Sequence, residues 1–138
     1  WEYTLLEPND FWNHVPQRYV SSYHFFNVPI TNGMKTKHSP LRIIKQTVLR
    51  NDFVAFKLDI DTPSIEIPIA VELLSNTDLH HLIDEFFFEL HFRCEIMMDC
   101  GWGDKMPTEM NGLKLDREHV LEYFQSLRKV GIRSHFWP

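Results

Sequence analysis

The order of apolar and polar residues divides the chain into alternating strand-like and helix-like segments. Stretches rich in β-branched and aromatic residues predict strands over residues 2–6, 23–28, 53–58, 82–92 and 132–137. Between them, capping residues and apolar residues at helical spacing predict helices over residues 10–14, 41–49, 64–74 and 116–130. Strands that alternate with helices in this way favour a largely parallel sheet with right-handed crossovers.

Local signals predict where several of these helices begin and end. Residues that commonly precede the first turn of a helix occur at three places: Ser39, which Pro40 follows, Ser64 and Asp116. Gly131 follows the last apolar residue of the helical stripe at 116–130, which is the usual place for a helix to end. We therefore expect helix starts at these three capping residues and a helix end at Gly131.

Two strands and one loop carry more detailed predictions. Residues 53–58 are apolar enough to predict burial on both faces. Residues 94–115 contain three glycines and Pro107 and predict a long loop, a feature that is usually functional. Side chains of residues 82–92 alternate between two faces, with Phe86, Phe88, Leu90 and Phe92 on one and Glu85, Phe87, Glu89 and His91 on the other.

Composition narrows the classes of protein to which the chain could belong. Its 138 residues are 43% hydrophobic and 14% aromatic, which is enough for one domain with a packed core. The net charge is −5 and Lys and Arg form no cluster, so we expect no nucleic-acid partner. Apolar runs are far shorter than the ~20 residues of a membrane-spanning helix, so no membrane segment is expected. Because Trp1 opens a strand-like stretch without Met, we expect the chain to begin inside a larger protein.

Polar side chains gather at the ends of four consecutive predicted strands. In open α/β sheets, ligands bind beyond the carboxyl ends of the strands, and these ends lie along one edge of the sheet. The residues in this position are Glu7, Asn27, Asp59 with Asp61, and Glu89 with His91. Their convergence is the strongest indication of a binding or catalytic cleft in the sequence.

Each of these groups also has a simpler, structural interpretation. Asp59 and Asp61 share a face if the strand continues, and they could hold a divalent cation, accept a proton from a substrate hydroxyl, or cap the next helix. His91 beside Glu89 suits a base or a hydroxyl-orienting group, but it also suits a strand face that the 94–115 loop covers. Glu7 could bind ribose hydroxyls or stand solvated in a turn.

Residues 94–102 add two features of open interpretation. Cys94 and Cys100 could form a local disulfide or remain free thiols, whereas a metal site would need more ligands in closer pairs. Trp102 lies between two glycines and could form part of a lid over a substrate or a hydrophobic plug.

Four stretches together resemble the FkbM-type methyltransferases, which are class I, Rossmann-like enzymes that use S-adenosylmethionine. They are LLEPN (5–9), HFFNVPI (24–30), VAFKLDIDTPSIE (54–66) and IDEFFFELHF (83–92), and they occur in the family's order. The chain departs from the family where Asp61-Thr62 replaces Glu-Gly. It also has no counterpart of the family's first strand and Gly-rich loop.

The resemblance implies a Rossmann-like, three-layer α/β sandwich, with a mostly parallel sheet, helices on both faces and an incomplete N-terminal side. It also implies O-methylation of a small-molecule or sugar hydroxyl, with S-adenosylmethionine as the cofactor and no metal. The expected cofactor-binding residues are Glu7, Asn27 and Asp61, and the expected catalytic residues are Asp59, Glu89 and His91. Two alternatives stay open: a metal-dependent glycosyltransferase that uses the Asp59-x-Asp61 pair, and a non-catalytic Rossmann-like binding module.

Overall fold

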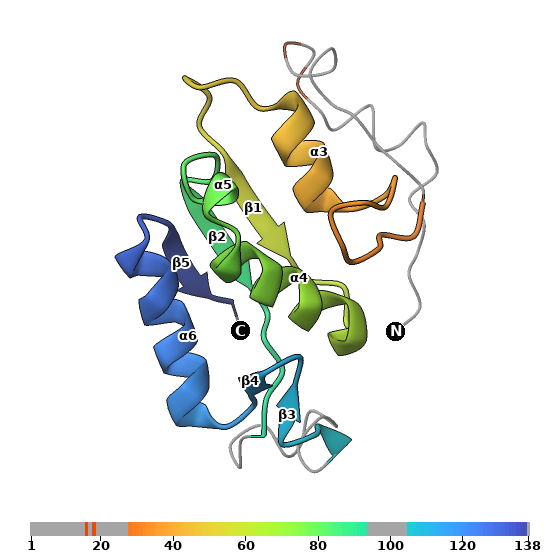
Figure 1. The fold of residues 1–138 in the computed structure, drawn as a ribbon, viewed down its shortest axis with the longest axis vertical. Helices are drawn as coiled ribbons and strands as arrows, with labels where there is room; N and C mark the ends of the chain where they lie inside the picture. Colours follow the sequence, from red (N-terminus) through yellow and green to blue (C-terminus); the bar gives the residue numbers. More distant parts are fainter. Residues whose placement is uncertain (1–15, 17, 19–27, 94–104, 138) are drawn as a thin grey trace.

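The computed structural model describes residues 16, 18, 28–93 and 105–137, and Figure 1 draws the rest as a grey trace. Its elements in chain order are helix α3 (Pro40–Thr47), strand β1 (Ala55–Leu58), helices α4 (Pro63–Ser75) and α5 (Thr77–His80), strand β2 (Glu85–Phe88), the short strands β3 (Glu109–Met110) and β4 (Leu113–Lys114), helix α6 (Arg117–Lys129) and strand β5 (Arg133–Phe136). The predicted strands at 2–6 and 23–28 and the helix at 10–14 fall, except for Val28, outside the described residues.

Strands β1, β2 and β5 form a parallel sheet in that order, as the alternation of elements predicts. In the register, Phe56 lies beside Phe86 and Phe86 beside Ser134, so the same face of all three strands is aligned. The connections pass through α4 and α5 and then through α6, giving an α/β architecture (Figure 1). No helix in the described part of the chain has the length and apolar character needed to cross a membrane.

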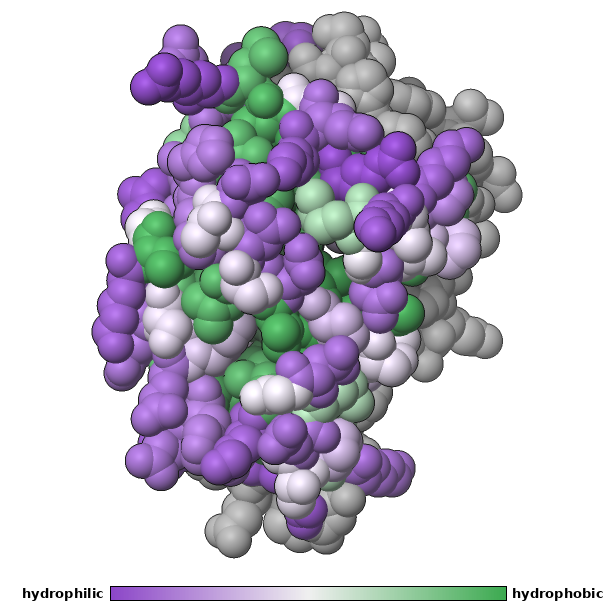
Figure 2. Space-filling view, viewed as in Figure 1, coloured by the Kyte–Doolittle hydropathy of each residue, from purple (hydrophilic) through white to green (hydrophobic). Residues whose placement is uncertain are grey.

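Helices α4 and α6 pack side by side on one face of this sheet. The Tyr123 hydroxyl of α6 donates a hydrogen bond to the Ala70 carbonyl oxygen of α4 at 2.9 Å. Phe86 and Phe88 of β2 are fully buried beneath these helices, and the rings of Phe88 and Phe124 lie 6.5 Å apart. The hydrophobic effect of burying this aromatic layer is the main force that holds the helices on the sheet. On the helix side of the molecule, apolar patches alternate with polar side chains (Figure 2).

The opposite face of the sheet carries a mixture of aromatic and charged residues. Lys57 and Ala55 are exposed there, so the expected burial of this strand on both faces is wrong. Phe87 stacks on His135 at 4.5 Å, and Arg133 forms an ion pair with Glu85 at 3.1 Å. Helices α4 and α6 pack on the face that carries Phe86 and Phe88, not on this one. The predicted third layer, with helices on both faces of the sheet, is therefore not established by the described residues.

The predicted starts of α3 and α6 and the predicted end of α6 are confirmed, whereas α3 ends at Thr47 rather than near residue 49. The Ser39 hydroxyl accepts a hydrogen bond from the backbone N–H of Arg42, and Pro40 takes the first position of α3. The Asp116 carboxylate accepts from the backbone N–H of His119 at 3.0 Å. Gly131 has φ of +99°, a conformation that glycine adopts without strain, and it ends α6.

Helix α4 begins two residues earlier than Ser64 predicts. Thr62 is its N-cap residue and Pro63 its first residue, which places Pro68 inside the helix. A proline at this position cannot donate a hydrogen bond to the carbonyl oxygen four residues earlier, that of Ser64. The Asn32 side-chain amide donates to this oxygen at 3.4 Å instead. A residue distant in sequence thus replaces the bond that Pro68 removes.

The predicted loop at 94–115 contains a hairpin in its described part. Strands β3 and β4 pair in antiparallel orientation across Asn111 and Gly112, whose φ values are +53° and +81°. An Asn-Gly pair with positive φ at both positions is the preferred two-residue hairpin turn. The hairpin lies near the carboxyl ends of the sheet strands, below them in Figure 1.

Candidate functional site

The loop between β1 and α4 is shaped by a buried carboxylate. Glu66 is only 2% exposed, and its two oxygens accept hydrogen bonds from the backbone N–H groups of Ile60 and Thr62, each at 2.9 Å. Burial raises the pKa of Glu66, while the two backbone hydrogen bonds oppose this rise. Between these two anchors, Asp61 takes a left-handed conformation with φ of +53°, which Asp tolerates better than most residues. Glu66 therefore fixes the backbone on both sides of Asp61.

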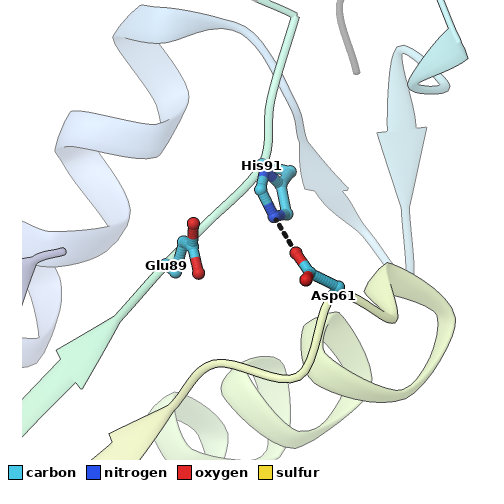
Figure 3. A group of neighbouring side chains, drawn as sticks. All are labelled: Asp61, Glu89 and His91. Carbon is cyan, nitrogen blue, oxygen red and sulfur yellow. Dashed lines mark hydrogen bonds and ion pairs between the residues drawn. The ribbon is translucent and has the colours of Figure 1, made fainter. Parts of the chain in front are cut away.

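Asp61, Glu89 and His91 converge at the carboxyl ends of β1 and β2 (Figure 3). His91 Nε2 lies 3.2 Å from Asp61 Oδ1, and the His91 side chain is 9% exposed. Glu89 and His91 follow β2 on the same side of the chain, whereas Asp61 approaches from the β1–α4 loop. The structure thus brings together three residues that the sequence placed at two neighbouring strand ends.

Asp59 and Glu89 form a second interaction, in which two carboxyl groups share a hydrogen bond. This hydrogen bond, desolvation and the negative charges of Asp59, Asp61 and Glu66 raise the pKa of Glu89 to about 7. The same hydrogen bond and the nearby Lys57 ammonium lower the pKa of Asp59. Two close carboxylates cannot both ionise easily, so the proton resides on Glu89 and the charge on Asp59.

Lys57 and Trp137 border this carboxyl pair on the face of the sheet away from α4 and α6. Lys57 Nζ forms an ion pair with Asp59 Oδ2 at 2.6 Å and lies 4.4 Å from the centre of the Trp137 ring. Trp137 is not among the site residues predicted from the sequence. A usable signal was nevertheless present, because Trp137 is the last residue of the predicted strand 132–137, just as Glu89 lies near the end of the predicted strand 82–92.

The expected Asp59-x-Asp61 pair does not act as a unit. Strand β1 ends at Leu58, and the positive φ of Asp61 breaks the alternation that would place both carboxylates on one face. Asp59 contacts Lys57 and Glu89, whereas Asp61 contacts His91. The predicted residues Glu7, Asn27, Cys94, Cys100 and Trp102 lie outside the described residues.

The arrangement suits two kinds of chemistry. A carboxyl group with a pKa near 7 can accept a proton from a substrate at neutral pH, since it is partly ionised there. In addition, single ligand atoms of Asp61, Glu89 and His91 all lie within 4.8 Å of one another, so these residues could together hold a divalent cation. The geometry of the described residues is compatible with either use.

Comparisons with known proteins supply no further assignment. No protein-family model matches the chain. No curated protein and no solved structure matches it either.

Proposed function

We propose that the chain belongs to an S-adenosylmethionine-dependent O-methyltransferase that acts on a hydroxyl group of a small molecule or sugar. The observation that carries this proposal is the Asp59–Glu89 pair, which lies at the carboxyl ends of two adjacent parallel strands. Ligands of open α/β sheets bind at this edge. The sequence resemblance to FkbM-type methyltransferases supports the same assignment.

The described part of the site fits the charge of the proposed cofactor. S-adenosylmethionine carries a sulfonium and an ammonium group, and Asp59, Asp61 and Glu89 make this edge of the sheet acidic. Of the three expected cofactor-binding residues, only Asp61 is described, and its exposed carboxylate is available to a ligand at this edge. When bound, the cofactor would supply an electrophilic methyl group.

In this proposal Glu89 is the general base. Once ionised, its carboxylate accepts the proton of the acceptor hydroxyl and thereby raises the nucleophilicity of the acceptor oxygen. Asp59 holds Glu89 in place and keeps its pKa close to neutrality. His91 orients Asp61 through their 3.2 Å contact, so that the acidic edge keeps one geometry.

Methyl transfer from radiolabelled S-adenosylmethionine to a panel of sugars, polyols and phenols tests the proposal. We expect turnover of the best acceptor to rise about tenfold per pH unit up to pH ~7 and to level off above it, because Glu89 must be ionised. Glu89→Gln should lower turnover by about 10²-fold or more while S-adenosylhomocysteine binding, measured by calorimetry, stays within a few-fold.

Glu85→Gln is the matched control. Glu85 is the first residue of β2, whereas Glu89 directly follows the last, and Glu85 pairs there with Arg133, away from the carboxyl pair. This variant should keep the turnover and pH profile of the parent. Absence of S-adenosylhomocysteine binding would refute the methyltransferase assignment, and an unchanged turnover of Glu89→Gln would refute the role of Glu89.

A cation-dependent glycosyltransferase is a second candidate, favoured by the spacing of Asp61, Glu89 and His91. In this case a divalent cation would take the place of the proton on Glu89 and bind the diphosphate of a sugar nucleotide. Thermal unfolding with manganese and a uridine-diphosphate sugar separates the two candidates. A rise in Tm that needs both additives, without any rise from S-adenosylhomocysteine, would favour the glycosyltransferase.

A further inference from the structure

Trp137 is held beside the carboxyl pair and yet stays partly open to solvent. Its backbone N–H donates a hydrogen bond to the carbonyl oxygen of Phe88 at 3.0 Å. Because Phe88 directly precedes Glu89, this bond fixes the Trp137 backbone close to the carboxyl pair. The Phe87 ring meets the Trp137 ring at 86° with 6.0 Å between their centres. Even so, 40% of Trp137 remains exposed. An indole that is fixed in place and still exposed beside polar groups is typical of ligand sites.

Three kinds of group meet at this position. Lys57 Nζ contacts both the Trp137 ring and Asp59 Oδ2, so the ammonium group connects the indole to the Asp59–Glu89 pair. We call Lys57, Trp137 and the Asp59–Glu89 pair the aromatic platform. It offers a flat π surface, a hydrogen-bond donor and carboxylate acceptors at one edge of the sheet.

A sugar ring presents the complementary chemistry. Its C–H groups carry small positive partial charges, which the negative face of an aromatic ring attracts. Its hydroxyl groups can donate to carboxylates and accept from an ammonium group. A cationic ligand suits the platform less well, because the positive charge of Lys57 beside the indole would repel it, whereas a neutral ring meets no such repulsion. An anionic ligand such as a phosphate would face the charge of Asp59.

We propose that the aromatic platform binds a neutral sugar ring, which stacks on Trp137 and directs a hydroxyl group toward Glu89. Trp137 is then a specificity-determining residue for the acceptor. As an assignment of the methyl acceptor, this inference rests on the proposed function, but binding of the sugar itself does not require the cofactor.

Saturation-transfer NMR of the full chain with methyl glycosides of glucose, galactose, mannose and rhamnose, without cofactor, tests this inference. We expect transfer to the C–H protons of one side of the ring for at least one glycoside. Trp137→Ala should weaken the binding of that glycoside at least tenfold, whereas Trp137→Phe, which retains a ring, should change it less than the Ala variant does.

Phe53→Ala is the matched control. Phe53 is an exposed aromatic residue with a cation over its ring, here Arg133 at 5.6 Å, but it lies before the amino end of β1 and away from the carboxyl pair. The control should bind the glycoside as the parent does. Equal losses in Phe53→Ala and Trp137→Ala would show non-specific binding and overturn the inference.

Further outcomes also overturn it. One is the absence of saturation transfer to any of the four glycosides. The other is a stronger transfer to adenosine, which serves as a nucleobase probe, if this transfer disappears in Trp137→Ala. Should Trp137→Ala lose the circular dichroism of the parent, Lys57→Met replaces it as the test variant, with at least a fivefold loss of glycoside binding expected. Calorimetry with S-adenosylhomocysteine is run separately, so failure of the methyltransferase assignment and failure of sugar binding give different results.

Discussion

Glu66 is a charged side chain within the hydrophobic core, and its two hydrogen bonds explain why it can lie there. Buried polar groups are tolerated when they are paired, and both Glu66 oxygens accept from backbone N–H groups of the β1–α4 loop. In Glu66→Gln, the amide group presents a donor to one of these N–H groups. We expect the free energy of unfolding to fall by about 1–3 kcal/mol, the usual cost of one buried unpaired donor. Urea unfolding measures this loss.

Glu122→Gln provides the comparison for Glu66→Gln. Glu122 is an exposed residue of α6, and the same substitution there should change the free energy of unfolding by less than about 0.5 kcal/mol. If Glu66→Gln changed the free energy of unfolding as little as Glu122→Gln does, the two hydrogen bonds of Glu66 would not stabilise the β1–α4 loop. Another contact would then have to fix the position of Asp61.

Helix α4 depends on a bond that no helix signal predicts. Asn32 donates to the Ser64 carbonyl oxygen, which Pro68 leaves without its helical partner. We expect Asn32→Ala to lower the free energy of unfolding by about 0.5–1 kcal/mol. In a Pro68→Ala background, the restored N–H at position 68 can pair with Ser64, so the same Asn32 substitution should then cost less. A double-mutant cycle by urea unfolding measures this coupling, and purely additive losses would contradict it.

Elements with local signals were predictable from the sequence, and those that depend on distant residues were not. Ser39, Asp116 and Gly131 each act within one turn of their own helix, and the structure confirms all three. The start of α4 was misplaced because it depends on Glu66, whose side chain folds back from the first turn onto the Thr62 N–H group, and on Asn32. The hairpin of β3 and β4 was missed, although Asn111-Gly112 is a recognisable turn signal.

The same distinction holds for the candidate site. One general rule, that ligands bind at the carboxyl ends of parallel strands, selected four residues of the site: Asp59, Asp61, Glu89 and His91. In the structure, these residues lie together at that edge of the sheet. Their pairing was not predictable, since it depends on how the loop turns at Asp61. Trp137 was missed because its neighbours are set by the pairing of β5 with β2.

The carboxyl groups of this site also make the stability of the folded chain depend on pH. A carboxyl group whose pKa is raised on folding binds its proton more tightly in the folded than in the unfolded state. For Glu89 the pKa rises from a usual value of 4.5 to about 7, and the pKa of Glu66 also rises. Their contribution to the free energy of unfolding is therefore fully present below pH 4.5 and is lost as the pH rises. For Glu89 this loss occurs as the pH passes through its folded-state pKa of about 7. Asp59, whose pKa is lowered, contributes in the opposite sense: its contribution is fully present above its usual pKa of 3.8 and is lost as the pH falls below that value.

Glu89→Gln isolates the Glu89 contribution from that of the eight histidines, which titrate in the same range. A glutamine amide can donate to Asp59 as the protonated carboxyl group does, but it cannot ionise. We therefore expect the free energy of unfolding of the parent, relative to Glu89→Gln, to fall steadily between pH 5 and pH 8. Urea unfolding of both proteins across this range measures the difference. A constant difference would show that Glu89 does not share its proton with Asp59, and the general-base proposal would lose its physical basis.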